Sequence, residues 1–186
     1  MTRIDPGTGV ILLAAGRSRR FGGDKLAAPF KGQPLWSWAA DAACEAGFAD
    51  RYLVTGPHSS IVAAEGWQIV VNAQADKGMG TSIAAGLEAA AATCDRLVVI
   101  LADMPLVTPD HLRRLANADG TVFTRYDEAG FGCPAAFPRS AFEKLRTLRA
   151  DRGARAIRLD DATTIDPEEG TSLVDIDTAQ DLSRFG

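Results

Sequence analysis

Residues 9–25, G-V-I-L-L-A-A-G-R-S-R-R-F-G-G-D-K, join an apolar run to glycines, a serine and several positive charges. The run over 10–14 is too short for a typical helix and too apolar for a solvated strand, so it predicts a strand buried on both faces, as in a parallel sheet. The glycines and basic side chains that follow suit a phosphate-binding loop. We therefore expect a ligand at the carboxyl end of a central strand, the usual position in open α/β sheets.

Two common nucleotide-binding signatures do not match this loop. A Walker A loop, G-x-x-x-x-G-K-[ST], fails because Asp24 separates Gly23 from Lys25 and Leu26 stands where the hydroxyl belongs. The dinucleotide fingerprint G-x-G-x-x-G does not follow the strand either. A basic surface loop with glycines for turning remains an alternative on composition alone.

Size and charge narrow the class of protein. The 186 residues give room for one sizeable core, so we expect a single domain over residues 1–186. A net charge of −4 argues against nucleic-acid binding and favours a small anionic ligand at the basic loop. Three cysteines without paired spacing, the lack of a signal-peptide segment and the lack of any apolar run near about 18 residues predict a cytoplasmic protein with no membrane partner.

Strand and helix patterns alternate after the loop. Helical spacing over 35–46 begins behind a proline and closes at Gly47, and strands are expected at 51–55 and 68–71 with a short helix over 60–65 between them. This alternation predicts a three-layer α/β/α sandwich with a mostly parallel sheet.

A second polar, glycine-rich segment covers residues 72–86, N-A-Q-A-D-K-G-M-G-T-S-I-A-A-G, and leads into an apolar helix. Backbone N–H groups at the start of that helix, beside Thr81 and Ser82, are suited to a ligand. Simple capping of the helix by one of these hydroxyls is an equal alternative.

The most apolar strand is expected at 96–102, and Asp103 follows it. A carboxylate at the tip of a buried strand suits a hard divalent cation such as Mg²⁺ that bridges phosphates. Taken alone, Asp103 could equally turn the chain or cap the helix from Thr108. We expect His111, on that helix, on its solvated face.

The residues Ala14-Ala15-Gly16-x-Ser18-x-Arg20-x-Gly22-x-x-Lys25 resemble the signature L-A-A-G-x-S-x-R-x-G-x-x-K of the MobA-like nucleotidyltransferases. Within that family the chain is most similar to molybdenum cofactor cytidylyltransferases, because guanylyl-transferring relatives usually carry L-A-G-G where this chain has L-A-A-G at 13–16. The resemblance implies a Rossmann-like sheet of the nucleotide-diphospho-sugar transferase type.

The resemblance also implies roles for individual residues. Catalytic roles would belong to Arg20, Lys25 and Asp103, and Mg²⁺ would be held by Asp103 with Asp175 or Asp177 from D-I-D-T at 175–178. Asp177 as a mere cap of the final helix has equal weight. The implied nucleotide-binding residues are Leu13, Ala14, Ala15, Gly16, Ser18, Arg20, Gly22, Lys25, Gly78, Met79, Gly80, Thr81, Ser82 and Ala102.

Two later segments are similar to the acceptor side of the family site. Residues 132–138, G-C-P-A-A-F-P, resemble G-x-P-x-x-F-x-R, with cysteine where histidine or asparagine is frequent. Residues 151–155, D-R-G-A-R, are similar to the end of G-D-x-G-A-R, although two arginines also suit a charged helix start. The implied acceptor-binding residues are Cys133, Pro134, Arg152 and Arg155.

The function implied by the resemblance is Mg²⁺-dependent transfer of CMP from CTP to molybdopterin, or to its molybdenum-loaded form, with release of pyrophosphate. A molybdoenzyme or its chaperone would be a protein partner. Three alternatives stay open: a guanylyltransferase or sugar- or polyol-phosphate nucleotidyltransferase of the same superfamily, a nucleotide- or cofactor-binding delivery protein without turnover, and an NAD-linked reductase. The pair Lys25 and Asp103 favours chemistry over binding alone, and the missing dinucleotide fingerprint disfavours the reductase.

Overall fold

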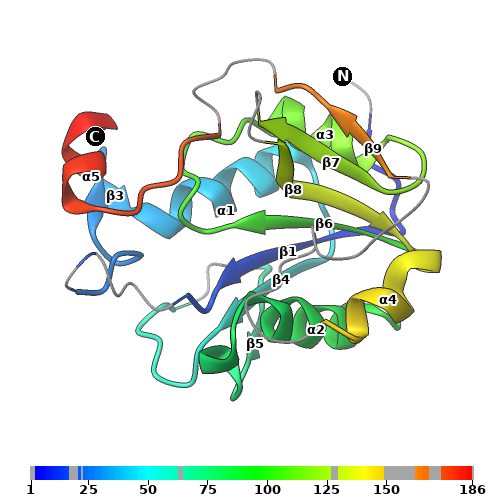
Figure 1. Ribbon diagram of the computed structural model, residues 1–186, viewed down its shortest axis with the longest axis horizontal. Helices are drawn as coiled ribbons and strands as arrows, with labels where there is room; N and C mark the ends of the chain where they lie inside the picture. Colours follow the sequence, from blue (N-terminus) through cyan, green and yellow to red (C-terminus); the bar gives the residue numbers. More distant parts are fainter. Residues whose placement is uncertain are drawn as a thin grey trace.

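The computed structural model describes residues 3–16, 21, 23–62, 65–126, 130–148, 162–167 and 173–185. Within them, one sheet has seven strands in the order β5-β4-β1-β6-β8-β7-β9, and only β8 runs against its neighbours (Figure 1). Its strands are β1 (Thr8–Ala14), β4 (Arg51–Thr55), β5 (Gln68–Val71), β6 (Arg96–Leu101), β7 (Val122–Tyr126), β8 (Gly130–Pro138) and β9 (Thr163–Ile165). A small two-stranded sheet joins β2 (Pro29–Phe30) and β3 (Gln33–Pro34).

Helices cover both faces of the large sheet. One face carries α1 (Leu35–Ala46) and α3 (Pro109–Ala116), and Leu182 of the short α5 (Ala179–Phe185) packs against the same core cluster. The other face carries α2 (Met79–Ala90) and α4 (Phe142–Arg146), which follows the 3₁₀ turn η3 (Arg139–Ala141). The expected three-layer α/β/α sandwich with a mostly parallel sheet is confirmed.

Strand β1 lies in the parallel part of the sheet, between β4 and β6, and every one of its residues is buried. Its alternate side chains serve the two cores: Val10 and Leu12 belong to the cluster under α1 and α3, and Ile11 and Leu13 to the cluster under α2 and α4. Each such side chain stabilises the fold by about 1.5–3 kcal/mol. The two-sided burial was expected from the apolar run, although the strand begins two residues earlier, at Thr8.

Helix α1 has the predicted bounds, with Pro34 as its N-cap and Gly47 in the left-handed region at φ 100° as its C-cap. The short helix expected over 60–65 is wrong for the residues described there: residues 60–62 have no regular structure. Ser60 Oγ donates to Asp24 and the Ile61 N–H donates to Ser59 Oγ. The first bond ties the segment to a residue 36 positions away, and the second is a local side-chain to backbone bond of the kind that gives the backbone an alternative to a helix. Among the described helices, none is long and apolar enough to cross a membrane.

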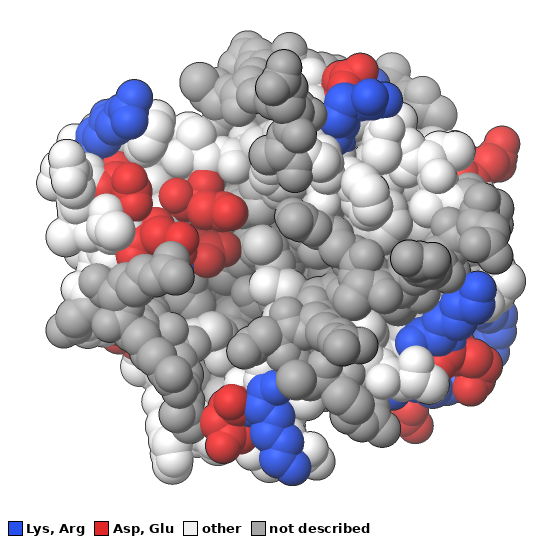
Figure 2. All heavy atoms as spheres, in the orientation of Figure 1, with Lys and Arg blue, Asp and Glu red and all other residues white. Residues whose placement is uncertain are grey.

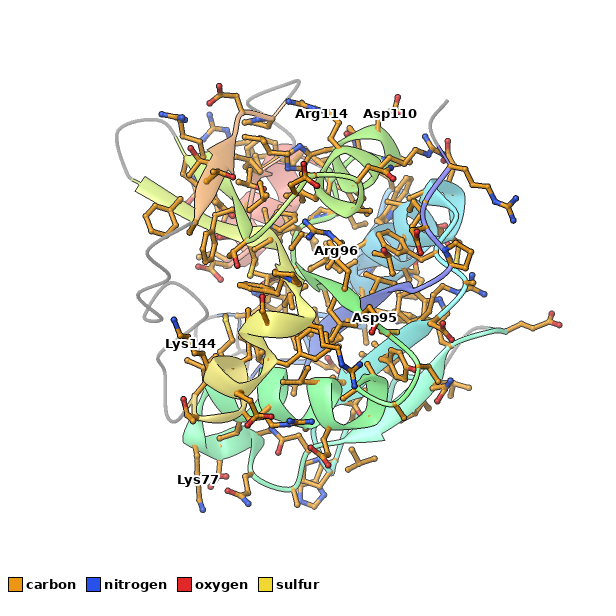
Figure 3. The ribbon with its side chains drawn as sticks, turned by 90° about the vertical axis from the view of Figure 1, so that its right-hand side faces the viewer. Lys77, Asp95, Arg96, Asp110, Arg114 and Lys144 are labelled. Carbon is orange, nitrogen blue, oxygen red and sulfur yellow. The ribbon has the colours of Figure 1, made fainter. Side chains whose placement is uncertain are left out.

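Charged residues at the amino end of the parallel strands have structural roles. Figure 3 looks at this end, where Asp95 and Arg96 stand at the start of β6. The Arg96 guanidinium donates to the carbonyl oxygens of Gly120 at 2.8 Å and Leu115 at 3.0 Å, and so closes the end of α3. The opposite, carboxyl edge of the parallel strands is therefore the edge left for a ligand.

The expectation that His111 faces solvent is wrong: it is fully buried on α3, beside Leu112 and Leu115. Its Nε2 lies 2.8 Å from Thr124 Oγ1 on β7. Because this partner is 13 residues away on the sheet, helical spacing alone could not show that a polar side chain would be accommodated inside. Burial, and then the charge of Arg114, lower the pKa of His111 to about 4.

His111 should make the protein acid-sensitive. The unfolded chain takes up the histidine proton near pH 6.5 but the folded chain only near 4, so the stability from this residue is complete above pH 6.5 and falls as the pH is lowered toward 4. The expected loss is about 3 kcal/mol. We expect the free energy of unfolding, measured by urea titration, to fall less between pH 7 and pH 4 in His111→Gln than in the wild type. The glutamine keeps an Nε–H donor but takes up no proton in this range. An equal decline in both proteins would contradict the burial of a neutral histidine.

Candidate active site

A cavity of about 400 Å³ lies at the carboxyl end of β1 and β6, beside the start of α2. It collects residues from four separated stretches of the chain, because parallel strands bring their following loops to one edge of the sheet. Its walls are Leu13, Ala15, Gly16, Lys25, Leu26, Ala75, Asp76, Gly78, Met79, Ser82, Leu101, Asp103 and Asp177. The loop after β1, the 72–86 segment, Asp103 and Asp177 therefore meet at one place.

A second cavity of about 500 Å³ adjoins the first and shares five of its wall residues, Ala15 and Gly16 among them. Its other walls are Ala14, Gly23, Asp24, Gly56, Pro57, His58, Ser59, Ile61 and Ala73. Residues 56–61 carry no motif that marks them as part of a site, but they follow β4 at the same sheet edge, and that position is the signal that could have found them. Each cavity has the size of a typical small-molecule site.

Lys25 is the central charge of the first cavity. Only 7% of its surface is exposed, and its Nζ donates to Asp103 Oδ2 at 2.9 Å and to Asp177 Oδ1 at 3.1 Å. Burial lowers the pKa of Lys25, but the charges and hydrogen bonds of Asp103 and Asp177 outweigh it and raise the pKa above its usual value. The lysine is therefore positively charged at neutral pH and oriented by two carboxylates.

The C-terminal segment reaches the cavity through a backbone hydrogen bond from the Ile176 N–H to the Asp103 carbonyl oxygen, at 2.9 Å. The Ile176 side chain is fully buried, which holds this segment against the end of β6. Thr178 and Asp181 form a reciprocal pair at the start of α5: Thr178 Oγ1 accepts from the Asp181 N–H and Asp181 accepts from the Thr178 N–H. Thr178 thus caps the final helix, and the Asp177 carboxylate points to Lys25 instead.

Asp175 adds a third carboxylate beside Asp103 and Asp177, and Figure 2 shows acidic side chains gathered on the side of the molecule where α5 lies. Desolvation, and then repulsion from Asp103 and Asp177, raise the pKa of Asp175 to about 6. The residue as a whole remains exposed, so water screens both effects. Within the described residues, no three side chains are already close enough together to hold a metal ion.

The wall made by the start of α2 depends on Gly78 and Asn72. Gly78 is the N-cap at φ 109°, a conformation that favours glycine. The buried Asn72 Nδ2 donates to Thr81 Oγ1 at 2.9 Å and to Ser82 Oγ at 3.0 Å. Neither hydroxyl caps α2, so the capping alternative is wrong.

Several predicted nucleotide-binding residues do not line either of the two cavities. Gly80 and Ala102 are buried and Thr81 bonds backbone carbonyls, so none of the three lines either cavity. On the acceptor side, Cys133 and Pro134 lie on β8 and also outside both cavities. Ser18, Arg20, Gly22, Arg152 and Arg155 fall outside the described residues.

Residues 10–164 match the MobA-like NTP transferase domain. The chain belongs to this family. The resemblance found in the loop after β1 is thereby confirmed, and the protein is a nucleotidyltransferase of the MobA-like superfamily.

Two curated relatives match at different lengths. The purine catabolism protein PucB of Bacillus subtilis is 30% identical over 189 residues, which cover 92% of each chain. Nicotine blue oxidoreductase of Paenarthrobacter nicotinovorans is 38% identical over 110 residues, which cover 56% of this chain and 53% of that protein. One relative of this chain therefore has a name that describes a redox activity.

Among solved structures, Rv0371c of Mycobacterium tuberculosis is 29% identical, with a TM-score of 0.77 over 98% of this chain and 97% of that chain. Rv0371c has also been solved in complex with manganese; that structure aligns at 26% identity and a TM-score of 0.71, over 96% of this chain and 97% of that one. The agreement over nearly the whole chain confirms the Rossmann-like fold of the nucleotide-diphospho-sugar transferase type.

Proposed function

We propose that this protein transfers CMP from CTP to molybdopterin, or to its molybdenum-loaded form, with release of pyrophosphate. The observation that carries transfer rather than binding is the buried Lys25, held between Asp103 and Asp177 at the cavity wall. A site for binding alone has no need of a buried cation paired with two strand-end carboxylates. The choice of CTP and of the acceptor is supported by the motif resemblance.

A divalent cation, Mg²⁺ in our proposal, would be held by Asp103 with Asp177 or Asp175. Within the described part of the chain, Lys25 is the positive charge that acts on these three carboxylates, so the described cluster has negative charge to offer a cation, and carboxylate oxygens suit hard divalent ions. When bound, the ion would neutralise charge on the phosphates. The manganese complex of Rv0371c supports a divalent site in this fold. Mg²⁺ is usually bound through one or two carboxylates plus phosphates, so a preassembled set of three is not required.

The chain's own groups supply positioning and charge for an acceptor phosphate oxygen that attacks the α-phosphorus of the nucleotide. Lys25 places its ammonium beside the phosphates, and the N-terminus of α2 presents backbone N–H groups at the cavity wall. Met79, 39% exposed although apolar, offers a contact surface for the base or ribose. Phosphoryl chemistry of this kind depends mainly on such positioning and electrostatic stabilisation.

Nucleotide choice should depend partly on Ala15, which lines both cavities. Its methyl group narrows a site that glycine would leave open, and one methyl group in a packed pocket discriminates by about 1–3 kcal/mol, or roughly 10- to 200-fold. Pyrophosphate release measured with each NTP and molybdopterin should therefore favour CTP, and Ala15→Gly should reduce the ratio of kcat/KM for CTP over GTP.

Ala92→Gly, at an exposed position after α2 that lines neither cavity, serves as the matched control. A wild-type preference for GTP would overturn the cytidylyl assignment, and an unchanged ratio in Ala15→Gly would assign the choice to other contacts. Turnover with sugar or polyol phosphates in place of molybdopterin would select another branch of the superfamily. Tight NTP binding with no pyrophosphate from any acceptor would indicate a delivery protein.

The second candidate is an NAD(P)H-dependent reductase, favoured by the similarity to nicotine blue oxidoreductase over about half of that protein. The sequence lacks the dinucleotide fingerprint after β1, which weighs against it. Consumption of NADH or NADPH by the protein with quinonoid dyes distinguishes the two functions. Reductase turnover that requires no NTP or divalent ion would overturn the transferase proposal.

A further inference from the structure

Two residues of β8 have no pairing partner on β7. The pairing runs from Phe123 with Ala135 directly to Thr124 with Gly132, which leaves Cys133 and Pro134 between two consecutive partners. On the other side, the pairing of β8 with β6 ends at Val99 with Ala135. Cys133 and Pro134 therefore form a bulge, defined here as the Cys133–Pro134 bulge. Bulges of this kind occur next to active sites, where they redirect a side chain.

Side chains of β7 bind the carbonyl groups of this bulge. Thr124 Oγ1 donates to the Pro134 carbonyl oxygen at 2.6 Å, and the Tyr126 hydroxyl donates to the Cys133 carbonyl oxygen. The Tyr126 hydroxyl also lies 3.8 Å from Sδ of Met104, the residue that follows Asp103. The bulge is thus tied to the chain segment that carries the proposed metal ligand.

His111 stands behind Thr124. A threonine hydroxyl has one proton, and because Thr124 gives it to Pro134, Nε2 of His111 must be the donor to Thr124 Oγ1. Nδ1 of His111 is then unprotonated, and it is buried without a partner among the described residues. Since both side chains are fully buried, the relay from His111 through Thr124 to Pro134 is closed to water.

We propose that Thr124 and His111 are positioning residues that fix the Cys133–Pro134 bulge against the acceptor, an inference that rests on the proposed transferase function. The bulge belongs to the segment that resembles the acceptor side of the family site, and Cys133 is half-buried, packed against the core cluster under α2 and α4. Among the described residues that line the two cavities, none is His111, Thr124 or Tyr126. Loss of the relay should therefore affect the acceptor and spare the NTP.

The kinetic test compares two substitutions. Thr124→Val deletes the hydroxyl at nearly constant side-chain shape, and Thr124→Ser keeps the hydroxyl. Thr124→Val should raise the acceptor KM or lower kcat by about tenfold or more in total, because small misplacements in a positioned site are costly. The Kd for CTP, measured by calorimetry, should stay within about twofold. Thr124→Ser should have acceptor kinetics close to those of the wild type. His111→Leu, which removes the hydrogen-bond donor to Thr124, should have acceptor kinetics like those of Thr124→Val.

The matched control is Thr121→Val, at a buried threonine just before β7 and away from the bulge. This variant measures how far a buried threonine-to-valine substitution by itself changes stability and kinetics. Two results would overturn the proposal and leave Thr124 with a structural role alone. In the first, Thr124→Val has the same Kd for CTP and the same acceptor kinetics as Thr121→Val. In the second, Thr124→Val weakens CTP binding as much as it weakens acceptor binding.

A second readout does not depend on catalysis. Alkylation of individual cysteines in the full chain, followed by mass spectrometry, should show faster modification of Cys133 in Thr124→Val, with the rate at exposed Cys44 unchanged. Faster alkylation together with wild-type acceptor kinetics would overturn the positioning role. If the wild-type protein shows no transfer at all, the proposed function is wrong. Independently of that result, an equal rate of Cys133 alkylation in Thr124→Val and in the wild type would show that the relay does not anchor the bulge.

Discussion

Asp103→Asn is expected to lower kcat for pyrophosphate release by about 10³-fold, the scale of a lost preorganised electrostatic or metal contact. The amide keeps the shape of the side chain and can still accept a hydrogen bond from Lys25 Nζ, which lies 2.9 Å away. The backbone bond from Ile176 to the Asp103 carbonyl oxygen does not involve the side chain. Activity should therefore be lost while the fold remains, as measured by steady-state kinetics and thermal unfolding.

The control for this substitution is Asp95→Asn at the opposite end of β6 (Figure 3). Asp95 pairs with Arg139 at an exposed position, where such pairs contribute little stability, and it lies far from the cavity. Mn²⁺ binding in the presence of CTP should weaken in Asp103→Asn and stay unchanged in Asp95→Asn. A parallel loss of melting temperature and activity in Asp103→Asn would mark Asp103 as a structural turn residue.

Lys25→Met should lower kcat by about 10²-fold or more, with a smaller change in NTP binding, because the lysine is assigned to charge that develops on the transferring phosphates. Methionine keeps most of the length of the side chain without its charge. The substitution also leaves Asp103 and Asp177 without their shared cation, so the unliganded protein should lose stability. Added Mg²⁺ or Mn²⁺ should restore more stability to Lys25→Met than to the wild type.

Lys144→Met, at an exposed residue of α4 that is labelled in Figure 3 and lines neither cavity, is the matched control. Its kinetics and its response to divalent ions should equal those of the wild type. Wild-type turnover in a folded Lys25→Met protein would overturn the assignment of the loop after β1 to the phosphates.

The local elements could be predicted because each leaves a signal in its own residues. The uniform burial of β1 follows from five adjacent apolar residues, and α1 follows from helical spacing between Pro34 and Gly47. Asp103 was predicted at the sheet edge because a polar residue that ends a buried strand of a parallel sheet has no other place. The predictions that failed, a helix over 60–65 and a solvated His111, concern residues whose partners lie elsewhere in the chain.

By itself, then, the sequence determined the layers of the fold and the family. Only the tertiary structure decided that Lys25 lies between two carboxylates 78 and 152 residues away, that a second cavity follows β4, and that Thr124 and His111 anchor the Cys133–Pro134 bulge. The physical reason is that periodicity and turn chemistry report which surface a segment buries. Which hydrogen-bonding groups then meet depends on strand order and register, and these are properties of the whole sheet.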